Sequence, residues 1–356
     1  MTRPVPYALT RLRTLMTPDP HDPDEAEGVL NPASGRGPDG ELYLLPRLVA
    51  RGNVSRVGLA RVVVADREPV GVERRGVVLA PSTRWESGAQ NAGVEDPRTT
   101  WVPDLGLHVM TYVAYGPLGP RTAVATSRDL RTWHRLGPLL FRHDPDLDVD
   151  LNLYPNKDVV LVPEVVRGPG GRPCFAVLHR PTWDLGLVRR GEREWPPSTT
   201  DDPRPSIWIA YADAAAVLAD PSALTLLHGA RPLAGPEQPW EALKIGAGPA
   251  PLRVPEGWLL LHHGVTGHIE DPWSADNDVR YCAGAMLLDA DDPSRVVART
   301  EQPLLEPETD DERHGTVADV VFPTAAERIG DDTYVFYGMA DARIGVARLD
   351  RVPGAA

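Results

Sequence analysis

Short apolar segments alternate with polar turns along most of the chain. The segments have the length and the apolar or β-branched composition of strands, and no long stretch repeats its apolar residues with the 3.6-residue period of an amphipathic helix. Turn signals are dense, because the sequence contains 38 prolines and 32 glycines spread along its length. The pattern therefore predicts an all-β protein, built as a sandwich, a barrel or a propeller.

A unit of two strands recurs five times along the chain, which favours a propeller among these architectures. Each unit has an apolar strand, a polar crossing and a second strand of small and apolar residues. The first strands begin at Leu42, Leu107, Pro173, Gly257 and Thr333, and separate second strands begin at Ser206 and Val279. A total of 356 residues leaves about 70 for each unit, enough for four strands with loops. We therefore predict a five-bladed β-propeller formed by one domain, residues 1–356; a two-sheet sandwich would give no reason for five similar units.

Two segments fall outside this repeat. Residues 1–40 are rich in proline, aspartate and glycine, and we expect them to form an N-terminal arm. Residues 181–205 are charged and proline-rich, and we expect an inserted loop at the rim of a central site. The N-terminus lacks the apolar core and cleavage site of a signal peptide, and no apolar run approaches the roughly 18 residues of a membrane helix. We therefore expect a cytoplasmic protein with no membrane partner.

Charge and cysteine content narrow the possible partners. The formal net charge is −13, which disfavours nucleic acid as a partner. The two cysteines, Cys174 and Cys282, make no disulfide framework, and no metal or nucleotide motif is present, so we expect no metal and no cofactor. Whether the chain forms a homo-oligomer is left open. Only two lysines, Lys157 and Lys244, occur beside 35 arginines, and both lie in dense polar motifs.

Charged clusters stand at the ends of the predicted strands, where a propeller gathers its loops around the central channel. The densest is NAGVEDPR, from Asn91 to Arg98, in which Glu95 and Asp96 would face opposite ways in an extended segment. Pro97 would fix the backbone after Asp96. The motif alone is equally well explained by a surface salt bridge. The other clusters are NKDVVLVPE from Asn156, HRP from His179, KIGAG from Lys244 with His262 and His263 further on, and YGMAD ending at Asp341.

The order of these motifs resembles that of the β-mannoside phosphorylases, glycoside hydrolase family 130. The resemblance rests on GVEDPR, NKDVVLVPE, HRP, KIGAGPAPLRVPEGWLLLHHGV, YCAGAMLLDADDPSRVV and YVFYGMADARIGVA, and it covers about Leu30 to Leu349. It implies a five-bladed propeller, in agreement with the repeat, and inverting phosphorolysis of a β-1,4- or β-1,2-linked mannoside to α-mannose 1-phosphate. The implied partners are a β-mannoside oligosaccharide and inorganic phosphate as co-substrate.

The resemblance also implies roles for individual residues. Asp96 would be the proton donor, acting through a sugar hydroxyl. The remaining candidates divide into phosphate-binding Arg121, Lys157, His179 and Arg180, and substrate-binding Arg47, Asn91, Arg98, Asp158, His263 and Asp341. The scheme is chemically consistent, because phosphate is already a charged nucleophile and needs a basic pocket opposite the acid in place of a general base. Lys157, a compact point charge, suits such a pocket.

Two other functions stay open at this point. A β-mannoside hydrolase on the same fold would use Asp96 with a base sought among Asp158, Glu241 and Asp341. A non-catalytic carbohydrate-binding propeller would instead need aromatic platforms. The tryptophans available for that purpose are Trp183, Trp195, Trp208, Trp240 and Trp258, although tryptophan at strand positions more often belongs to the core.

Overall fold

β-Strands make up most of the chain, which confirms the all-β prediction. The computed structural model describes residues 4–183, 198, 202–269 and 277–352. Within those residues the α-helices are α1 (Ala214–Ala219) and α2 (Asp310–Arg313), and neither has the length or the hydropathy needed to cross a membrane. Single 3-10 turns lie between strands, at η1 (Pro23–Glu25), η2 (Arg84–Glu86), η3 (Leu151–Leu153), η4 (Pro169–Gly171), η5 (Pro221–Thr225) and η6 (Pro239–Glu241).

The strands fall into five antiparallel groups of four. The first is β2 (Gly28–Arg36), β3 (Leu42–Ala50), β4 (Val54–Ala65) and β5 (Glu68–Leu79), and the second is β6 (Ala92–Val102), β7 (Leu107–Gly116), β8 (Gly119–Ser127) and β9 (His134–Pro138). The third is β11 (Asn156–Arg167), β12 (Pro173–Pro181), β13 (Ile207–Asp213) and β14 (Leu226–Ala234), with β10 (Leu140–Phe141) beside β14. The fourth is β15 (Lys244–Ala247), β17 (Gly257–His268), β18 (Asp278–Leu288) and β19 (Val296–Arg299), with β16 (Leu252–Val254) beside β17. The fifth is β20 (Val321–Ile329), β21 (Asp332–Met339), β22 (Arg343–Arg351) and β1 (Tyr7–Met16).

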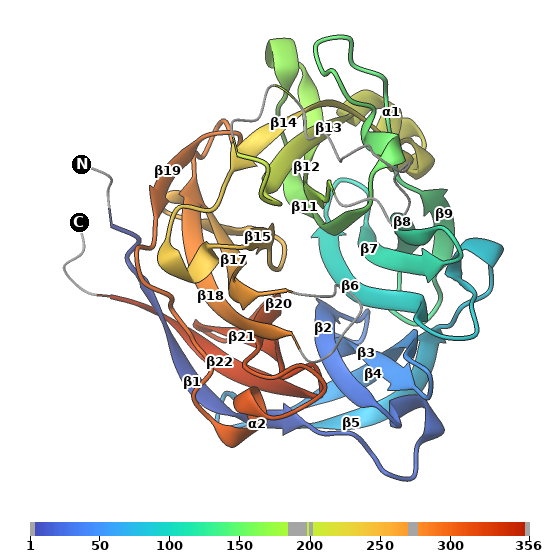
Figure 1. Cartoon of the computed structure of the whole chain (residues 1–356), viewed down its shortest axis with the longest axis vertical. Coiled ribbons are helices and arrows are strands. Elements are labelled where there is room, and N and C mark those ends of the chain that lie inside the picture. The colour runs from blue at the N-terminus through green and yellow to red at the C-terminus, as the bar shows by residue number, and fades with distance from the viewer. Residues whose placement is uncertain (1–3, 184–197, 199–201, 270–276, 353–356) are drawn as a thin grey trace.

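The first strand of each group faces a common centre, around which the groups follow one another in sequence order (Figure 1). These five strands are β2, β6, β11, β15 and β20, and side chains on β6 and β20 bond to the backbone of a neighbouring one. Thr99 Oγ1 of β6 donates to the Ser34 carbonyl of β2, and Thr324 Oγ1 of β20 donates to the Pro32 carbonyl at 2.7 Å. We call these five the inner strands. A short parallel bridge between β4 and β6 also joins the first two groups into one sheet.

The hydrophobic core is divided into five clusters, and each lies between two neighbouring groups. Four of them separate consecutive groups along the chain. The remaining cluster packs the fifth group against the first, with Phe336 and Val346 on one side and Leu44 and Val62 on the other. Every group therefore buries both of its faces against neighbouring groups. This explains why some strands are apolar on both faces, since each face packs on a hydrophobic cluster.

A buried glutamate recurs beside three of the groups and is held in the same way each time. It ends a short helical turn, accepts backbone N–H groups in a capping arrangement, and receives hydrogen bonds from an arginine and from a tyrosine or histidine. The three sets are Glu86 with Arg135 and Tyr112, Glu241 with Arg299 and His262, and Glu312 with Arg11 and Tyr337. Burial alone would raise the pKa of Glu241, but His262 and Arg299 lower it to about 2. Glu241 is therefore fixed in the fold and is not available as a catalytic base.

The N-terminal segment is part of the fold and corrects the expectation of an arm over residues 1–40. β1 pairs antiparallel with β22 along its whole length, and β2 is an inner strand. The reason is that the alternating pattern of β1 buries Tyr7 and Leu9 in the cluster that packs the fourth group against the fifth. Most of the expected loop at 181–205 lies outside the described residues.

Because β1 completes the last group, shortening one of its inward side chains should destabilise the whole protein. Leu9→Ala removes buried methyl groups and is expected to lower the free energy of unfolding by about 2–4 kcal/mol, measured by urea denaturation. Thr10→Ala, at the adjacent exposed position, should change it by no more than about 0.5 kcal/mol. Equal stability of the two variants would mean that β1 is not integral to the fold.

Candidate functional site

The charged residues singled out from the sequence gather at one end of the inner strands. The strand register shows this, since Leu30 of β2 pairs with Arg47, Lys157 of β11 with Arg180, and Gly246 of β15 with His263. Leu30 and Lys157 lie near the start of their inner strands, and Gly246 lies in the four-residue strand β15. We call this end of the inner strands the charged end.

Asp96 lies at the charged end between a guanidinium and an amide. Arg47 NH1 donates to Asp96 Oδ1 at 3.1 Å, and Asn31 Nδ2 donates to the same oxygen at 2.9 Å. Arg47 also donates to Glu95 Oε1 at 3.0 Å, so both neighbouring carboxylates share one guanidinium. Burial would raise the pKa of Asp96, but Arg47, Asn31 and Lys157 together lower it.

Asp158 is the buried centre to which three other side chains are tied. Arg180 Nε donates to its Oδ2 at 2.5 Å, Arg98 NH2 donates to its Oδ1 at 3.2 Å, and His263 Nε2 lies 3.5 Å from Oδ2. Burial would raise the pKa of Asp158, and the charges of Arg180 and Arg98 hold it well below its usual range. A side chain at Gly246 would place its Cβ 2.2 Å from Asp158 Oδ2, which explains why glycine stands there.

The pKa of Asp341 is shifted in the opposite direction from those of Asp96 and Asp158. It follows β21 in a turn with a φ of +48°, close enough to Arg47 and Asp96 to interact with both charges. Burial raises its pKa to about 6, and the negative charges of Asp96 and Glu95 work in the same direction. Asp96 and Asp341 therefore form a carboxylate pair in which Asp341 holds a proton more tightly than Asp96 does.

The four residues expected to bind phosphate share this end of the fold but differ in accessibility. Lys157 is half-buried, with its ammonium 5.8 Å from the centre of the Tyr115 ring. Arg121 is also half-buried, and burial lowers its pKa. Arg180 is buried and tied to Asp158, as described above. His179 is fully buried, and burial lowers its pKa to about 3, so it is a neutral ring in the folded protein.

Two of the residues expected to bind substrate differ sharply in exposure. His263 is only 1% exposed and packs on Phe322 with ring centroids 4.4 Å apart, so it supports Asp158 and has no surface to offer a sugar. Asn91 is exposed and lies at the rim, where its Oδ1 accepts a hydrogen bond from Asn53 Nδ2 at 3.0 Å. Four of the tryptophans considered as sugar platforms are core residues, namely Trp183, Trp208, Trp240 and Trp258, and Trp195 lies outside the described residues.

Asn31 and Asn156 belong to the site although the sequence analysis did not select them. Asn31 bonds to Asp96, and Asn156 Nδ2 lies 3.0 Å from His179 Nδ1. The sequence marks the neighbour of Asn31, which is Gly338 in the YGMAD motif. A Cβ at Gly338 would lie 2.0 Å from Asn31 Oδ1. The glycine of the YGMAD motif is therefore needed for the approach of this amide.

The arrangement can supply a proton and hold an anion, but the described part of the chain offers no cluster of side chains suited to a metal ion. One carboxylate pair with unequal pKa values interacts with the charge of Lys157, which remains partly accessible. Sites that protonate a leaving group while binding an anionic nucleophile need these two features together.

Comparison with known proteins agrees with this chemistry. A family model described as β-1,4-mannooligosaccharide phosphorylase matches residues 200–352. A 1,2-β-oligomannan phosphorylase of Thermoanaerobacter sp. (strain X514) is 32% identical over 270 residues, which are 74% of this chain and 71% of the relative. A β-1,2-mannobiose phosphorylase from the same strain is 33% identical, over 73% of this chain and 67% of the relative. The solved structure of the β-1,2-mannobiose phosphorylase from Listeria innocua superposes with a TM-score of 0.68 at 23% identity, over 97% of this chain and 96% of that one.

The raised pKa of Asp341 has a consequence for stability that can be measured. Burial disfavours the ionised carboxylate of Asp341 in the folded protein, so its ionisation lowers the free energy of unfolding. The protonated form gives full stability below about pH 4, and this stability is lost as the pH rises through about 6. Asp341→Asn should therefore stabilise the protein by about 2 kcal/mol at pH 7.5 and hardly at all at pH 4. Urea denaturation at both pH values checks this. A gain of equal size at both pH values, or a loss at pH 7.5, would contradict the assignment.

Proposed function

The chain belongs to glycoside hydrolase family 130, the β-mannoside phosphorylases, and on that premise we propose that it cleaves β-mannosides with inorganic phosphate. The products are α-mannose 1-phosphate and a saccharide shortened by one mannose. The observation that carries the proposal is the position of Lys157, a partly accessible cation interacting with the charges of both Asp96 and Asp341. A hydrolase has no use for an anion-binding cation there, whereas a phosphorylase requires one.

We propose that the five groups are the blades of a β-propeller. The support is the recurrence of four antiparallel strands, the five inner strands around one centre, and the hydrophobic cluster between the last group and the first. β1 would then join the two ends of the chain in one blade, as a strand taken from the N-terminus (Figure 1). The charged end of the inner strands would be the mouth of the central channel, which is where propellers bind ligands.

In the proposed reaction Asp96 provides the proton through a hydroxyl of the bound mannose. A phosphate oxygen attacks the anomeric carbon, the glycosidic C–O bond breaks, and its oxygen leaves with a proton relayed from Asp96. Because Arg47 and Asn31 favour the ionised form of Asp96, the proton of the pair rests on Asp341 between turnovers and is shared with Asp96 when substrate excludes water. Inversion at the anomeric carbon follows from attack on the face opposite the leaving oxygen.

Lys157 and Arg121 bind the phosphate in this scheme. Arg180 is oriented by Asp158 and offers its remaining N–H groups. His179 is fully buried and neutral, so it supports the pocket from behind through its contact with Asn156 and does not touch the anion itself. Charge-assisted hydrogen bonds of this kind gain strength in a partly dry pocket.

For the substrate we propose a β-1,2-linked mannoside ahead of a β-1,4-linked one. Three relatives that each match more than 70% of the chain are named for β-1,2 linkages. The reaction consumes free phosphate, in keeping with the cytoplasmic location expected from the sequence.

Asp96→Asn should abolish turnover while preserving the fold, because the amide still accepts the hydrogen bonds of Arg47 and Asn31 but cannot donate the proton. The loss of rate is expected to be about 10²- to 10⁴-fold, measured as mannose 1-phosphate released from β-1,2-mannobiose with excess phosphate. The matched control is Asp104→Asn, an exposed carboxylate in the β6–β7 turn, which should keep the wild-type rate. If the Asp96 variant retains more than about a tenth of the rate, the donor is another carboxyl group, and Asp341, whose pKa is raised, comes next.

Lys157→Ala should weaken phosphate binding selectively. Removing one charged donor costs about 1.5–3 kcal/mol, so the apparent KM for phosphate should rise by about 10- to 150-fold. The KM for the mannoside should change much less, and Lys244→Ala, the same substitution at the other lysine, should leave both nearly unchanged.

The same assay separates phosphorolysis from hydrolysis and ranks the linkages. β-1,2-Mannobiose and β-1,4-mannobiose are each supplied with and without phosphate, and mannose 1-phosphate is measured against free mannose. We expect phosphate-dependent release, faster from the β-1,2-linked sugar. Free mannose released at an equal rate without phosphate, and unaffected by Lys157→Ala, would assign the protein to the hydrolases.

A further inference from the structure

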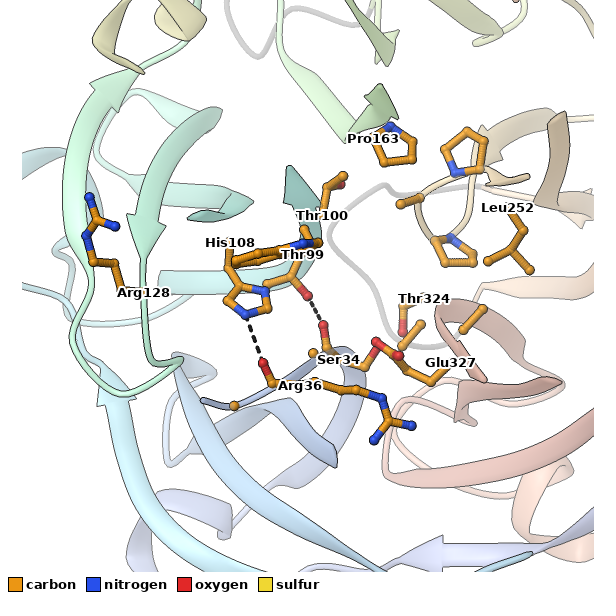
Figure 2. A pocket seen from close by; sticks show the side chains of 18 of the residues that line it. Ser34, Arg36, Thr99, Thr100, His108, Arg128, Pro163, Leu252, Thr324 and Glu327 are labelled. Carbon is orange, nitrogen blue, oxygen red and sulfur yellow. Dashed lines mark hydrogen bonds between the residues drawn. The ribbon is translucent and has the colours of Figure 1, made fainter. Parts of the chain in front are cut away.

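A cavity lies along the same inner strands, away from the charged end. It has a volume of about 550 Å³, within the range of small-molecule sites. Its lining residues come later along the inner strands than the residues of the charged end, so that Ser34 follows Asn31, Thr99 follows Asp96 and Pro163 follows Asp158. The cavity therefore lies toward the other end of these strands, where Figure 2 shows its lining side chains.

Arg98 separates the two sites. Its side chain is 2% exposed, and it bonds to Asp158 on the charged side. Its NH1 donates to the carbonyls of Ala247 and Gly248, which directly precede the cavity residue Pro249. A saccharide bound at the charged end therefore cannot extend into the cavity, and whatever occupies the cavity is a separate molecule.

The walls of the cavity are rigid and largely apolar. Prolines at four positions line it, and they resist collapse because their backbone is fixed: Pro38, Pro163, Pro249 and Pro251. Trp101 lines it as well and is 47% exposed, the largest aromatic surface left uncovered among the described residues. The Trp101 ring is held by His108, with centroids 4.7 Å apart, so its orientation is set before any ligand arrives.

The polar groups of the cavity accept more hydrogen bonds than they donate. Ser34 Oγ donates to Glu327 Oε1 at 2.9 Å, and Thr99 Oγ1 donates to the Ser34 carbonyl, so both hydroxyls keep free lone pairs. Burial raises the pKa of Glu327. Arg128 is exposed at the rim and supplies donors (Figure 2).

These features fit a neutral polyhydroxylated ring better than an ion. A cation would meet the guanidinium groups of Arg36 and Arg128, and an anion would meet the carboxyl of Glu327 and two acceptor oxygens. A sugar hydroxyl can donate to the acceptors and accept from Arg128, while the C–H face of a pyranose covers Trp101. We propose that this cavity is a second saccharide-binding site, which takes one or two sugar rings and acts apart from the proposed catalytic site.

The test counts binding events by titration calorimetry with β-1,2-mannobiose and no phosphate. Asp96→Asn serves as the background, so that the probe is not consumed. We expect two events in this background and one when Trp101→Ala is added, with the affinity of the lost event reduced at least about tenfold. Glu327→Gln preserves shape and should weaken the same event by about 2- to 10-fold.

Leu140→Ala is the matched control, because it truncates another exposed apolar side chain far from the cavity lining, and it should leave both events unchanged. Isotherms that stay the same in Trp101→Ala and in Glu327→Gln would overturn the proposal. The outcome is independent of the proposed phosphorolysis: a Trp101-dependent event supports the second site even if no mannose 1-phosphate is ever formed, and its absence leaves the catalytic proposal untouched.

Discussion

The burial of Asp158 is the constraint on which the charged end of the molecule depends. A carboxylate removed from water is costly unless it is paired and hydrogen-bonded, and Asp158 obtains its partners from three different groups of strands. Arg98 comes from the second group, Arg180 from the third and His263 from the fourth. Removing either arginine would weaken the pairing of a buried carboxylate, so the network fixes how the three groups approach each other.

The catalytic proposal follows from that arrangement, because two other carboxyl groups at the charged end, those of Asp96 and Asp341, lie in different environments. Asp96 sits against Arg47 and is kept ionised, whereas burial outweighs the charge of Arg47 at Asp341, which retains its proton to about pH 6. Two carboxyls with pKa values pushed apart are a recognised basis for acid and base roles. The network also pairs the guanidinium groups of Arg98 and Arg180 with Asp158. Lys157 and Arg121 stay partly accessible, and they are the cations proposed to make the main contacts with phosphate.

Much of the fold could be predicted from the sequence, because the second and third strands of each group are apolar and bounded by turns. The predicted starts at Leu42, Leu107 and Gly257 coincide with β3, β7 and β17. β1 was missed because its partner β22 lies more than three hundred residues away, and pairing over that distance leaves no local pattern. The inner strands were only partly recognised, since polar site residues interrupt their apolar pattern.

The candidate site could be predicted as a set of motifs, but its internal geometry could not. Glu95 and Asp96 were expected to face opposite ways, yet a φ of +45° at Asp96 turns the backbone and lets both reach Arg47. His263 was expected to touch substrate because burial cannot be read from a histidine pair in a strand. In the same way nothing in KIGAG revealed that its first glycine makes room for a carboxylate.

The most direct test of the account is a crystal structure of the Asp96→Asn variant with β-1,2-mannobiose and phosphate. The account predicts a phosphate within hydrogen-bonding distance of Lys157 Nζ, on the face of the mannose ring opposite to the side chain at position 96. It further predicts that a hydroxyl of that mannose contacts the side chain at position 96. Phosphate bound away from Lys157, or on the same face as position 96, would contradict the account.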